Sequence, residues 1–227
     1  MPRPLVPDRR GRILTAARDL TLESGWPNTT IAQIAERAGI GKGAVYREFE
    51  DKTAILAAVL NRSMRDLTAQ VHQRVIDAAE LVDLPAVYRF GVEALLSDPL
   101  MRALYLGDDA VLGQHVHGVT DQRYPTRLDW LTDYIERLQA AGVVNGTVPT
   151  ETIARMLSVF TVGLINSPGV LGSANPRVLV DTVNLFADLV GKGLSTDQAI
   201  DVTAARQAQL ALLDRLSEQL DLLEGST

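Results

Sequence analysis

Apolar residues recur at spacings of three and four along nearly the whole chain, and few segments alternate with a period of two. Spacings of three and four place apolar side chains on one face of an α-helix, whereas a half-buried β-strand needs a period of two. The clearest stripe consists of Ile31, Ile34, Ala35 and Ala38. The sequence therefore predicts an all-α fold.

Capping residues divide this pattern into separate helices. Thr30 precedes the stripe with Gln33 three residues later, which is the spacing of a capping box, and Gly39 can supply a left-handed stop. Asp98-Pro99 and Asn175-Pro176 each combine a capping side chain with the proline that is favoured at the first helical position. Both pairs predict helix starts.

The second half of the chain contains three further helices. Asn145-Gly146 and Ser167-Pro168-Gly169 bound a helix at about 149–166 that is apolar on most sides, so we expect it to be buried. A partner helix follows at about 176–190. A last helix at 202–223 carries leucines at 3-4-3 spacing, and it either docks on its own subunit or extends an interface.

Three helical units follow one another between Ile13 and Leu56, and a turn of only about three residues, Gly39-Ile40-Gly41, joins the second to the third. Two short helices joined so tightly must cross steeply, which is the helix-turn-helix arrangement. The apolar residues that can share one small core are Ile13, Ala17, Leu20, Ile34, Ala35, Ile40, Val45 and Phe49. We therefore divide the chain into a helix-turn-helix domain, 1–54, and a larger helical domain, 55–227.

The opposite face of the third unit is suited to nucleic acid. It displays Lys42, Gly43, Ala44, Tyr46 and Arg47, which combine two cations and a phenol with two residues small enough for close approach to a base edge.

Two flanking residues are suited to phosphate. Thr30 lies at a helix N-terminus, where backbone N–H groups and a hydroxyl favour anions, and Lys52 lies in the first turn of the next helix. A cation opposes the helix dipole at that end, and a phosphate partner would offset this cost.

The distribution of charge supports a nucleic-acid partner, although the whole chain carries a formal charge of −6. Residues 1–62 contain ten Lys and Arg against seven Asp and Glu, a net of +3, which leaves a net of −9 for residues 63–227. A basic N-terminal part followed by an acidic remainder indicates that the N-terminal part contacts nucleic acid and that the remainder has a different role.

Together these residues resemble the TetR (tetracycline repressor-like) family of transcriptional regulators over about the first fifth to quarter of the chain. By this resemblance, Lys42, Gly43, Ala44 and Tyr46 take the base and backbone positions of the recognition helix, and Thr30 and Lys52 take phosphate-anchoring positions. The matching residues are Gly25-Trp26, Thr29-Thr30-Ile31, Ile34-Ala35, Ala38-Gly39-Ile40-Gly41-Lys42-Gly43-Ala44-Val45-Tyr46, Phe49, Lys52 and Leu56.

The chain also departs from the family pattern at three positions. Gly41 and Ala44 stand where family members often carry a hydroxyl residue, and Glu48 stands where His or an aromatic residue is common. Phosphates repel a carboxylate, so we expect Glu48 to orient Arg47 or Lys52, or to accept a hydrogen bond from a cytosine amino group.

The resemblance implies a homodimer on a near-palindromic operator, with the helices at 149–166 and 176–190 forming the interface. It also implies that a small-molecule effector binds the C-terminal half and releases DNA, which favours a repressor over an activator. Tyr105, His115, Trp130 and Tyr134 are our candidate ligand-binding residues, although buried aromatic residues usually serve core packing. The acidic body disfavours a highly anionic ligand.

Other classes of function find little support in the sequence. The absence of cysteine removes disulfides and thiolate metal sites and fits a reducing cytoplasm, and no apolar stretch approaches the ~20 residues of a membrane span. His72, His115 and His117 lack metal-ligand spacing, Asp108-Asp109 reads as a helix cap, and no motif predicts a cofactor or catalysis. The alternative is an all-α protein that binds a partner or ligand and has lost DNA binding.

Overall fold

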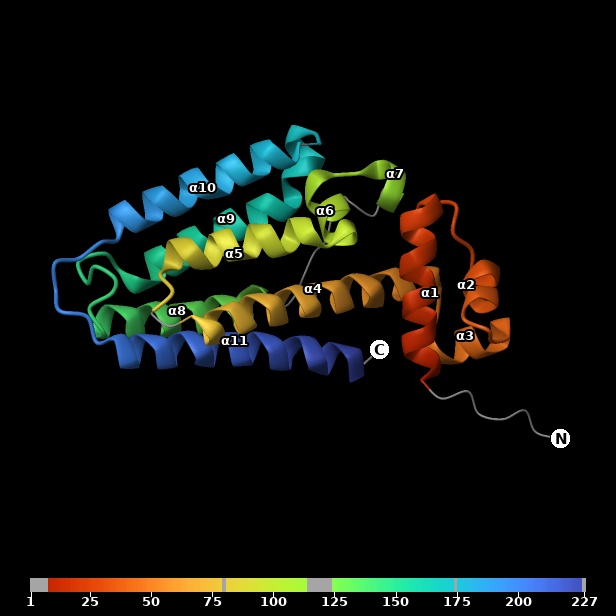
Figure 1. The fold of residues 1–227 in the computed structure, drawn as a ribbon, viewed down its shortest axis with the longest axis horizontal. Helices are drawn as coiled ribbons and strands as arrows, with labels where there is room; N and C mark the ends of the chain where they lie inside the picture. The colour runs from red at the N-terminus through yellow and green to blue at the C-terminus, as the bar shows by residue number, and fades with distance from the viewer. Residues whose placement is uncertain (1–7, 79–80, 114–123, 174, 226–227) are drawn as a thin grey trace.

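The computed structural model describes residues 8–78, 81–113, 124–173 and 175–225, and within these ranges it contains helices and no strand (Figure 1). The predicted all-α fold is therefore confirmed. The helices are α1 (Arg9–Ser24), α2 (Ile31–Arg37), α3 (Lys42–Glu48), α4 (Lys52–Asp77), α5 (Leu84–Ser97), α6 (Pro99–Leu106), α7 (Asp109–Leu112), α8 (Tyr124–Ala140), α9 (Thr150–Leu171), α10 (Pro176–Gly193) and α11 (Val202–Gly225).

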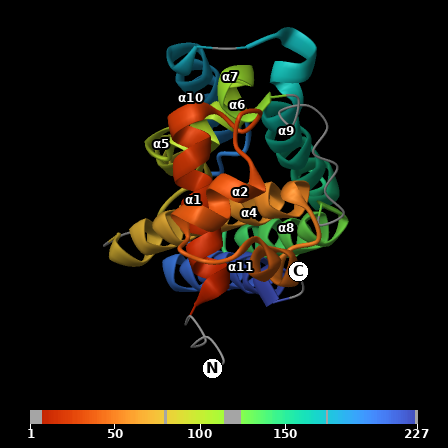
Figure 2. The same cartoon turned by 90° about the vertical axis from the view of Figure 1, so that its right-hand side faces the viewer.

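Helices α1, α2 and α3 form a head at one end of the molecule, and Figure 2 views this end with α1 and α2 in front of the body. The capping box of α2 is present, because Thr30 Oγ1 accepts from Gln33 N at 3.2 Å and Gln33 Oε1 accepts from Thr30 N at 2.8 Å. Gly39 has a φ of +68°, the left-handed conformation that stops the helix. The predicted small core is confirmed, with Ile40 half-buried against it.

The long helix α4 connects the head to the body. Asp51 caps its N-terminus by accepting from Ala54 N at 2.7 Å, and the helix then runs for 26 residues along the body (Figure 1). The predicted domain boundary at 54 and 55 lies in its first turn, so one continuous helix belongs to both parts. Helix α11 packs against α4 and α8 of its own chain, which is one of the two roles predicted for the last helix.

Helix α9 is longer than the sequence pattern predicts. Proline lacks the N–H that would bond to the carbonyl four residues earlier, so Ser167-Pro168-Gly169 was expected to end the helix. Instead Ser167 Oγ donates to the Leu164 carbonyl at 3.0 Å, and α9 continues to Leu171. Pro168 is buried, and a Cβ on Gly107 would lie 2.5 Å from Pro168 Cβ. Pro168 therefore stays inside α9 and packs closely against Gly107 at the end of α6.

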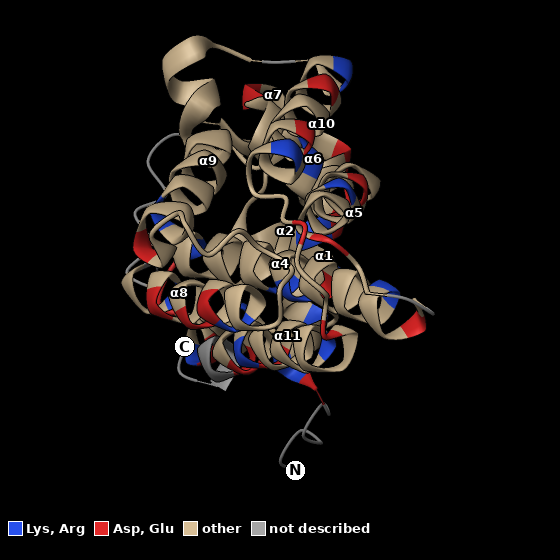
Figure 3. Cartoon of the chain, turned by 90° about the vertical axis from the view of Figure 1, so that its left-hand side faces the viewer, with Lys and Arg blue, Asp and Glu red and all other residues tan. Residues whose placement is uncertain are grey.

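The expectation that α9 is buried is only half right. Ile153 and Leu157 are buried, but Val159 is 66% exposed. The sequence contains no charged residue between Met156 and Pro176, and most of α9 is accordingly uncoloured in Figure 3. Among the described residues, α9 is the one helix whose length and composition would allow it to cross a membrane, whereas the sequence pattern predicted none. Core helices of soluble proteins share that composition, and α9 packs against α6 and α8.

Candidate nucleic-acid interface and effector cavity

The outer face of α3 carries the predicted DNA-contacting side chains. Val45 is fully buried and fixes the inner face of this seven-residue helix, so that Lys42, Gly43, Tyr46 and Arg47 are exposed. Tyr46 exposes 57% of its surface. A tyrosine this exposed beside two cations forms a surface that can meet base edges and phosphates.

Two residues of α3 lie differently from the expectation. Ala44 is 9% exposed, because it precedes Val45 at the edge of the buried face and its side chain is a single methyl group. Glu48 faces neither Arg47 nor Lys52; its Oε1 lies 3.6 Å from Arg9 Nε. The start of α1 runs beside the end of α3, and Arg9 therefore neutralises the carboxylate that had weakened the case for DNA contact.

Arg10 strengthens the same junction between α1 and α3. Its NH1 donates to the Glu48 carbonyl at 3.3 Å, and its guanidinium lies 4.5 Å from the centroid of the Phe49 ring. Cations near a helix C-terminus are favoured by the helix dipole and by the carbonyls left without helical partners. The junction therefore fixes the end of the proposed recognition helix.

Lys52 has a partner inside the protein. Its Nζ donates to the Trp26 carbonyl at 2.6 Å and lies 4.5 Å from the centroid of the Trp26 ring. Partial burial lowers the pKa of Lys52. The carbonyl and the ring offset the unfavourable position of a cation at the helix start, so a phosphate is not needed to explain this lysine.

The body contains a cavity of about 340 Å³ between α4, α5, α6, α8, α9, α10 and α11. Most of its walls are aliphatic, with hydroxyl groups and one guanidinium among them, which is the usual composition of a small-molecule site. The lining residues are Met64, Leu67, Thr68, Val71, Val87, Tyr88, Gly91, Val92, Leu95, Tyr105, Arg127, Leu131, Ser158, Thr161, Leu164, Leu179, Val183, Leu212, Leu213 and Leu216.

The structure brings one of the four predicted ligand-binding residues to this cavity. Tyr105 lines it, whereas Trp130 and Tyr134 do not, and His115 lies outside the described residues. Burial raises the pKa of Tyr134, whose hydroxyl faces Gln209 Nε2 at 3.5 Å in a neighbouring part of the core. Core packing therefore accounts for Tyr134.

Arg127 and Tyr88 also line the cavity, and neither is among the ligand-binding residues predicted from the sequence. Arg127 precedes Leu131, Ile135 and Leu138 at helical spacing, so it occupies the apolar face of α8. A cation on an apolar face is a signal that could have found the site. Arginine is most often found at a surface, so this position by itself does not identify a cavity.

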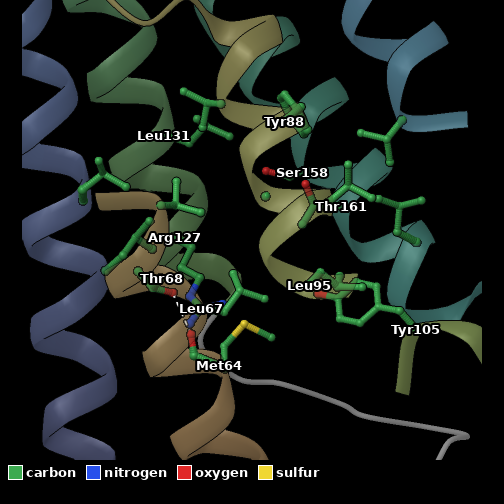
Figure 4. A pocket seen from close by; sticks show the side chains of 18 of the residues that line it. Met64, Leu67, Thr68, Tyr88, Leu95, Tyr105, Arg127, Leu131, Ser158 and Thr161 are labelled. Carbon is green, nitrogen blue, oxygen red and sulfur yellow. Dashed lines mark hydrogen bonds between the residues drawn. The ribbon is translucent and has the colours of Figure 1, made fainter. Parts of the chain in front are cut away.

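The polar groups of the cavity lie in separate places (Figure 4). Arg127 reaches from α8 towards Met64 and Thr68 of α4, Tyr105 lies beside Leu95 on the other side, and Tyr88 is near Ser158. Arg127 Nε donates to Gln219 Oε1 of α11 at 2.7 Å. This hydrogen bond connects the guanidinium to the last helix.

Tyr88 also belongs to an aromatic cluster beside the cavity. Its ring meets those of Phe160 and Phe186 edge to face, with centroids 6.0 and 5.2 Å away, and the two phenylalanine rings stack on each other. Burial raises the pKa of Tyr88 to about 12, against a hydrogen bond with Thr161 that lowers it. The Tyr88 hydroxyl therefore keeps its proton in alkaline solution at a pH at which an exposed tyrosine is ionised.

A chain of contacts connects the cavity to the head. After Tyr105, α6 ends at Gly107, and α7 then docks on the loop that follows α1, where the Val111 carbonyl accepts from Trp26 N at 2.7 Å. The fit is close, since a Cβ on Gly25 would lie 2.3 Å from the Ala110 carbonyl oxygen. Trp26 in turn holds Lys52 at the start of α4.

The histidines do not form a metal site within the described part of the chain, where no group of three or more His, Cys, Asp or Glu side chains could hold an ion. His72 Nε2 lies 3.4 Å from Asp214 Oδ1 of α11. His115 and His117 lie outside the described residues. Asp108 caps α7, as predicted, by accepting from Ala110 N and Val111 N.

Comparison with known proteins supports the assignment of the head. Residues 13–59 match the model of the bacterial regulatory proteins, tetR family. The chain is 39% identical over 73 residues to the HTH-type transcriptional regulator BetI of Klebsiella pneumoniae strain 342, which covers 32% of this chain and 35% of the relative. It is 35% identical over 66 residues to the HTH-type transcriptional activator FasR of Mycolicibacterium smegmatis, 29% of this chain and 30% of that protein. The matches thus span about a third of these curated relatives.

Solved structures resemble a larger part of the fold. A putative TetR-family transcriptional regulator from Syntrophomonas wolfei matches with a TM-score of 0.56 at 23% identity, covering 84% of this chain and 98% of that one. The SmeT–triclosan complex matches with a TM-score of 0.55 at 22% identity, covering 83% and 92%. At such low identity these neighbours support the fold, a helix-turn-helix head joined to a larger helical domain, and nothing finer.

Proposed function

We propose that the protein is a ligand-responsive transcriptional regulator, from the premise that residues 13–59 match the model of the tetR family of bacterial regulatory proteins. It binds a near-palindromic operator as a homodimer in the cytoplasm and represses transcription until a small molecule releases it. It has no catalytic role. The single observation that carries the proposal is the exposed, basic face of α3 on a folded helix-turn-helix.

Operator binding rests on side chains already directed outward. Lys42, Tyr46 and Arg47 present two cations and a phenol to the major groove, and Gly43 permits close approach of the backbone. Thr30 adds a hydroxyl at the N-terminus of α2, where backbone N–H groups favour a phosphate. The pairing of Glu48 with Arg9 reduces the repulsion between this surface and DNA.

Dimerisation rests on an apolar surface that the chain leaves exposed. Met156 and Val159 of α9 and Leu185 and Leu189 of α10 are 41 to 66% exposed. The two residues of each helix are three or four positions apart, so they lie on one helix face. Exposed apolar faces are typical of interfaces in soluble proteins, and a closed two-fold pair is the commonest oligomer. We therefore propose that α9 and α10 pair with their symmetry mates and hold two recognition helices about one DNA turn (~34 Å) or a multiple of it apart.

Control by an effector rests on the two connections between cavity and head. Helix α4 begins beside α3 and lines the cavity with Met64 and Thr68, while α6 lines it with Tyr105 and continues into the α7 contact with Trp26. A ligand that alters the packing of either helix changes the position of the heads. The coupling free energy between two such sites is typically ~1 to 3 kcal/mol and is reciprocal. Operator DNA therefore lowers the affinity of the protein for the ligand by the same factor by which the ligand lowers its affinity for DNA.

The test is a fluorescence-anisotropy titration of the full chain against DNA from just upstream of its own gene, at two salt concentrations and with excess competitor DNA. We expect specific, salt-dependent binding that Tyr46→Ala and Lys42→Ala each weaken without lowering the melting temperature. Arg137→Ala, which removes an exposed cation from α8 in the body, is the matched control and should bind like the wild type. Unaltered binding in both α3 variants would overturn the assignment.

A further inference from the structure

We propose that the cavity in the body binds an uncharged apolar molecule whose single hydroxyl group lies between Ser158 and Tyr88. This inference rests on the proposed function and deepens it, because it names the chemical class of the effector and the end of the cavity that recognises it. Binding to the cavity requires no DNA, so the inference can be tested separately from operator recognition.

Ser158 supplies a hydroxyl group that the protein itself leaves unused. It lines the cavity from α9, and its oxygen has no hydrogen-bond partner within the described part of the chain. Thr161, three residues later on the same helix face, instead donates to the Leu157 carbonyl at 3.0 Å. Ser158 is only half-buried, and its oxygen is not among the enclosed side-chain atoms, so a molecule in the cavity can reach it.

Tyr88 lines the same end of the cavity from α5, near Ser158 (Figure 4). Its hydroxyl is hydrogen-bonded with Thr161. A phenol oxygen both donates and accepts, so it can bond to a ligand as well as to Thr161. Ser158, Thr161 and Tyr88 therefore form a hydroxyl cluster that can accept from, and donate to, a hydroxyl group of a ligand.

The charge of the ligand follows from the composition of this hydroxyl cluster. Among the described residues, no Asp, Glu, Lys or His lines the cavity, and Arg127 lies away from the hydroxyl cluster (Figure 4). An ammonium group or a carboxylate placed at the cluster would therefore be buried without an opposite charge beside it. Transfer of an unpaired charge from water into apolar surroundings is strongly unfavourable, whereas a hydroxyl group needs only hydrogen bonds.

Arg127 has partners of its own in the protein. Its Nε donates to Gln219 Oε1 of α11 at 2.7 Å, and the side chain has a further interaction within the protein. An acidic ligand at this position would compete with these contacts and would leave the hydroxyl of Ser158 without a partner. We therefore assign Arg127 to the packing of α8 against α11 and not to an anionic ligand.

The remaining walls of the cavity determine the rest of the ligand. They consist mostly of leucine and valine side chains from α4, α5, α8, α9, α10 and α11. Such walls gain free energy from contact with an apolar molecule and offer few groups that could satisfy further polar atoms. The cavity therefore favours a ligand with one polar group at the hydroxyl cluster and an apolar body elsewhere.

The hydroxyl cluster lies where a ligand can affect the proposed dimer interface. Ser158 and Thr161 line the cavity from α9. Met156 and Val159 of the same helix are exposed on the surface that we propose for dimerisation. A ligand that bonds to Ser158 and extends to Leu67 of α4 contacts both the proposed dimer helix and the helix that begins at the head.

The experiment measures binding by isothermal titration calorimetry of the full chain with four probes that share one apolar chain: heptan-1-ol, 1-chloroheptane, heptanoate and heptylammonium. The variant Ser158→Ala removes the unused hydroxyl and introduces a residue that favours helix. Ser195→Ala, which removes an exposed hydroxyl outside the cavity, is its matched control. Gly91 lines the cavity and has no atom within 4 Å of an added Cβ, so Gly91→Phe fills the cavity without a backbone clash.

We expect heptan-1-ol to bind about threefold to tenfold more tightly than 1-chloroheptane, because a hydrogen bond between neutral groups has an effect of that size. Heptanoate and heptylammonium should bind about tenfold or more weakly than heptan-1-ol, because their charges would be buried unpaired. Ser158→Ala should lower the affinity for heptan-1-ol to about that for 1-chloroheptane, and leave the affinity for 1-chloroheptane unchanged. Ser195→Ala should leave all four affinities unchanged, and Gly91→Phe should abolish binding while its thermal unfolding stays cooperative.

The proposal is overturned if 1-chloroheptane, heptanoate or heptylammonium binds as tightly as heptan-1-ol, or if none of the four probes binds. It is also overturned if Ser158→Ala leaves heptan-1-ol binding unaffected or if Gly91→Phe binds like the wild type. Heptan-1-ol that binds this site without changing operator affinity supports the ligand class and contradicts its role as effector. Operator binding in a protein that binds none of the probes supports the regulator and overturns the inference, so the two failures are distinguishable.

Discussion

Replacement of Lys52 with methionine separates a structural role from a phosphate-binding one. Methionine keeps most of the apolar stem and removes the ammonium that donates to the Trp26 carbonyl at 2.6 Å and lies 4.5 Å from the Trp26 ring. A hydrogen bond to a charged group contributes about 1.5 to 3 kcal/mol, and a cation–π contact at an exposed site about 0.5 to 1 kcal/mol. Removal of a cation from a helix N-terminus stabilises the protein by about 0.3 to 1 kcal/mol, which offsets part of this loss.

Because Lys52 is half-exposed, solvent screening keeps the net effect at the lower end. We expect Lys52→Met to destabilise the protein by about 1 to 2 kcal/mol, which corresponds to a fall in Tm of about 2 to 8 °C for a chain of this size. The assay is differential scanning calorimetry, together with the salt dependence of non-specific DNA binding. The salt slope should change little, because the Lys52 ammonium is bonded to the Trp26 carbonyl rather than to a phosphate.

Lys42→Met is the matched control, since Lys42 is exposed on α3. It should leave Tm unchanged and reduce the salt slope by about 1, as expected when one phosphate contact is lost. If Lys52→Met instead leaves Tm unchanged and lowers the salt slope by about 1, as expected of Lys42→Met, the structural role of Lys52 is wrong. Lys52 would then be the phosphate anchor that the sequence pattern and the family resemblance predict.

Two further predictions concern other parts of the chain. Val159→Arg places a cation on the exposed apolar face of α9, and we expect light scattering to show that it converts a dimer into a monomer. The same substitution at exposed Gln73 of α4 should leave the dimer intact. A Val159→Arg protein that remains dimeric would rule out α9 as the interface. Gly25→Ala should destabilise the protein, because φ is +82° and the new Cβ would lie 2.3 Å from the Ala110 carbonyl oxygen. Gly91→Ala in α5 should instead raise the free energy of unfolding by about 0.5 to 1 kcal/mol, since nothing lies within 4 Å of the added Cβ. Chemical denaturation measures both variants, and a Gly25→Ala protein more stable than Gly91→Ala would contradict this prediction.

The amino-acid sequence by itself determined the secondary structure and the head. Helical spacing, the Thr30 and Gln33 capping box, the left-handed Gly39 and the Asn175-Pro176 start all act within a few residues of one another, so they can be recognised without knowledge of the fold. The dense motif from Gly25 to Leu56 is equally local, because the three helices of the head are adjacent in the chain.

Tertiary structure alone decided which side chains become partners across long separations. Glu48 lies against Arg9, Lys52 binds the Trp26 carbonyl, and Arg127 meets Gln219, which is 92 residues away. Pro168 stays inside α9, where it packs close to Gly107 and Ser167 caps the carbonyl that proline leaves without a donor. The cavity has the same origin: its walls come from seven helices, and their relative positions depend on packing over the whole body rather than on any local pattern.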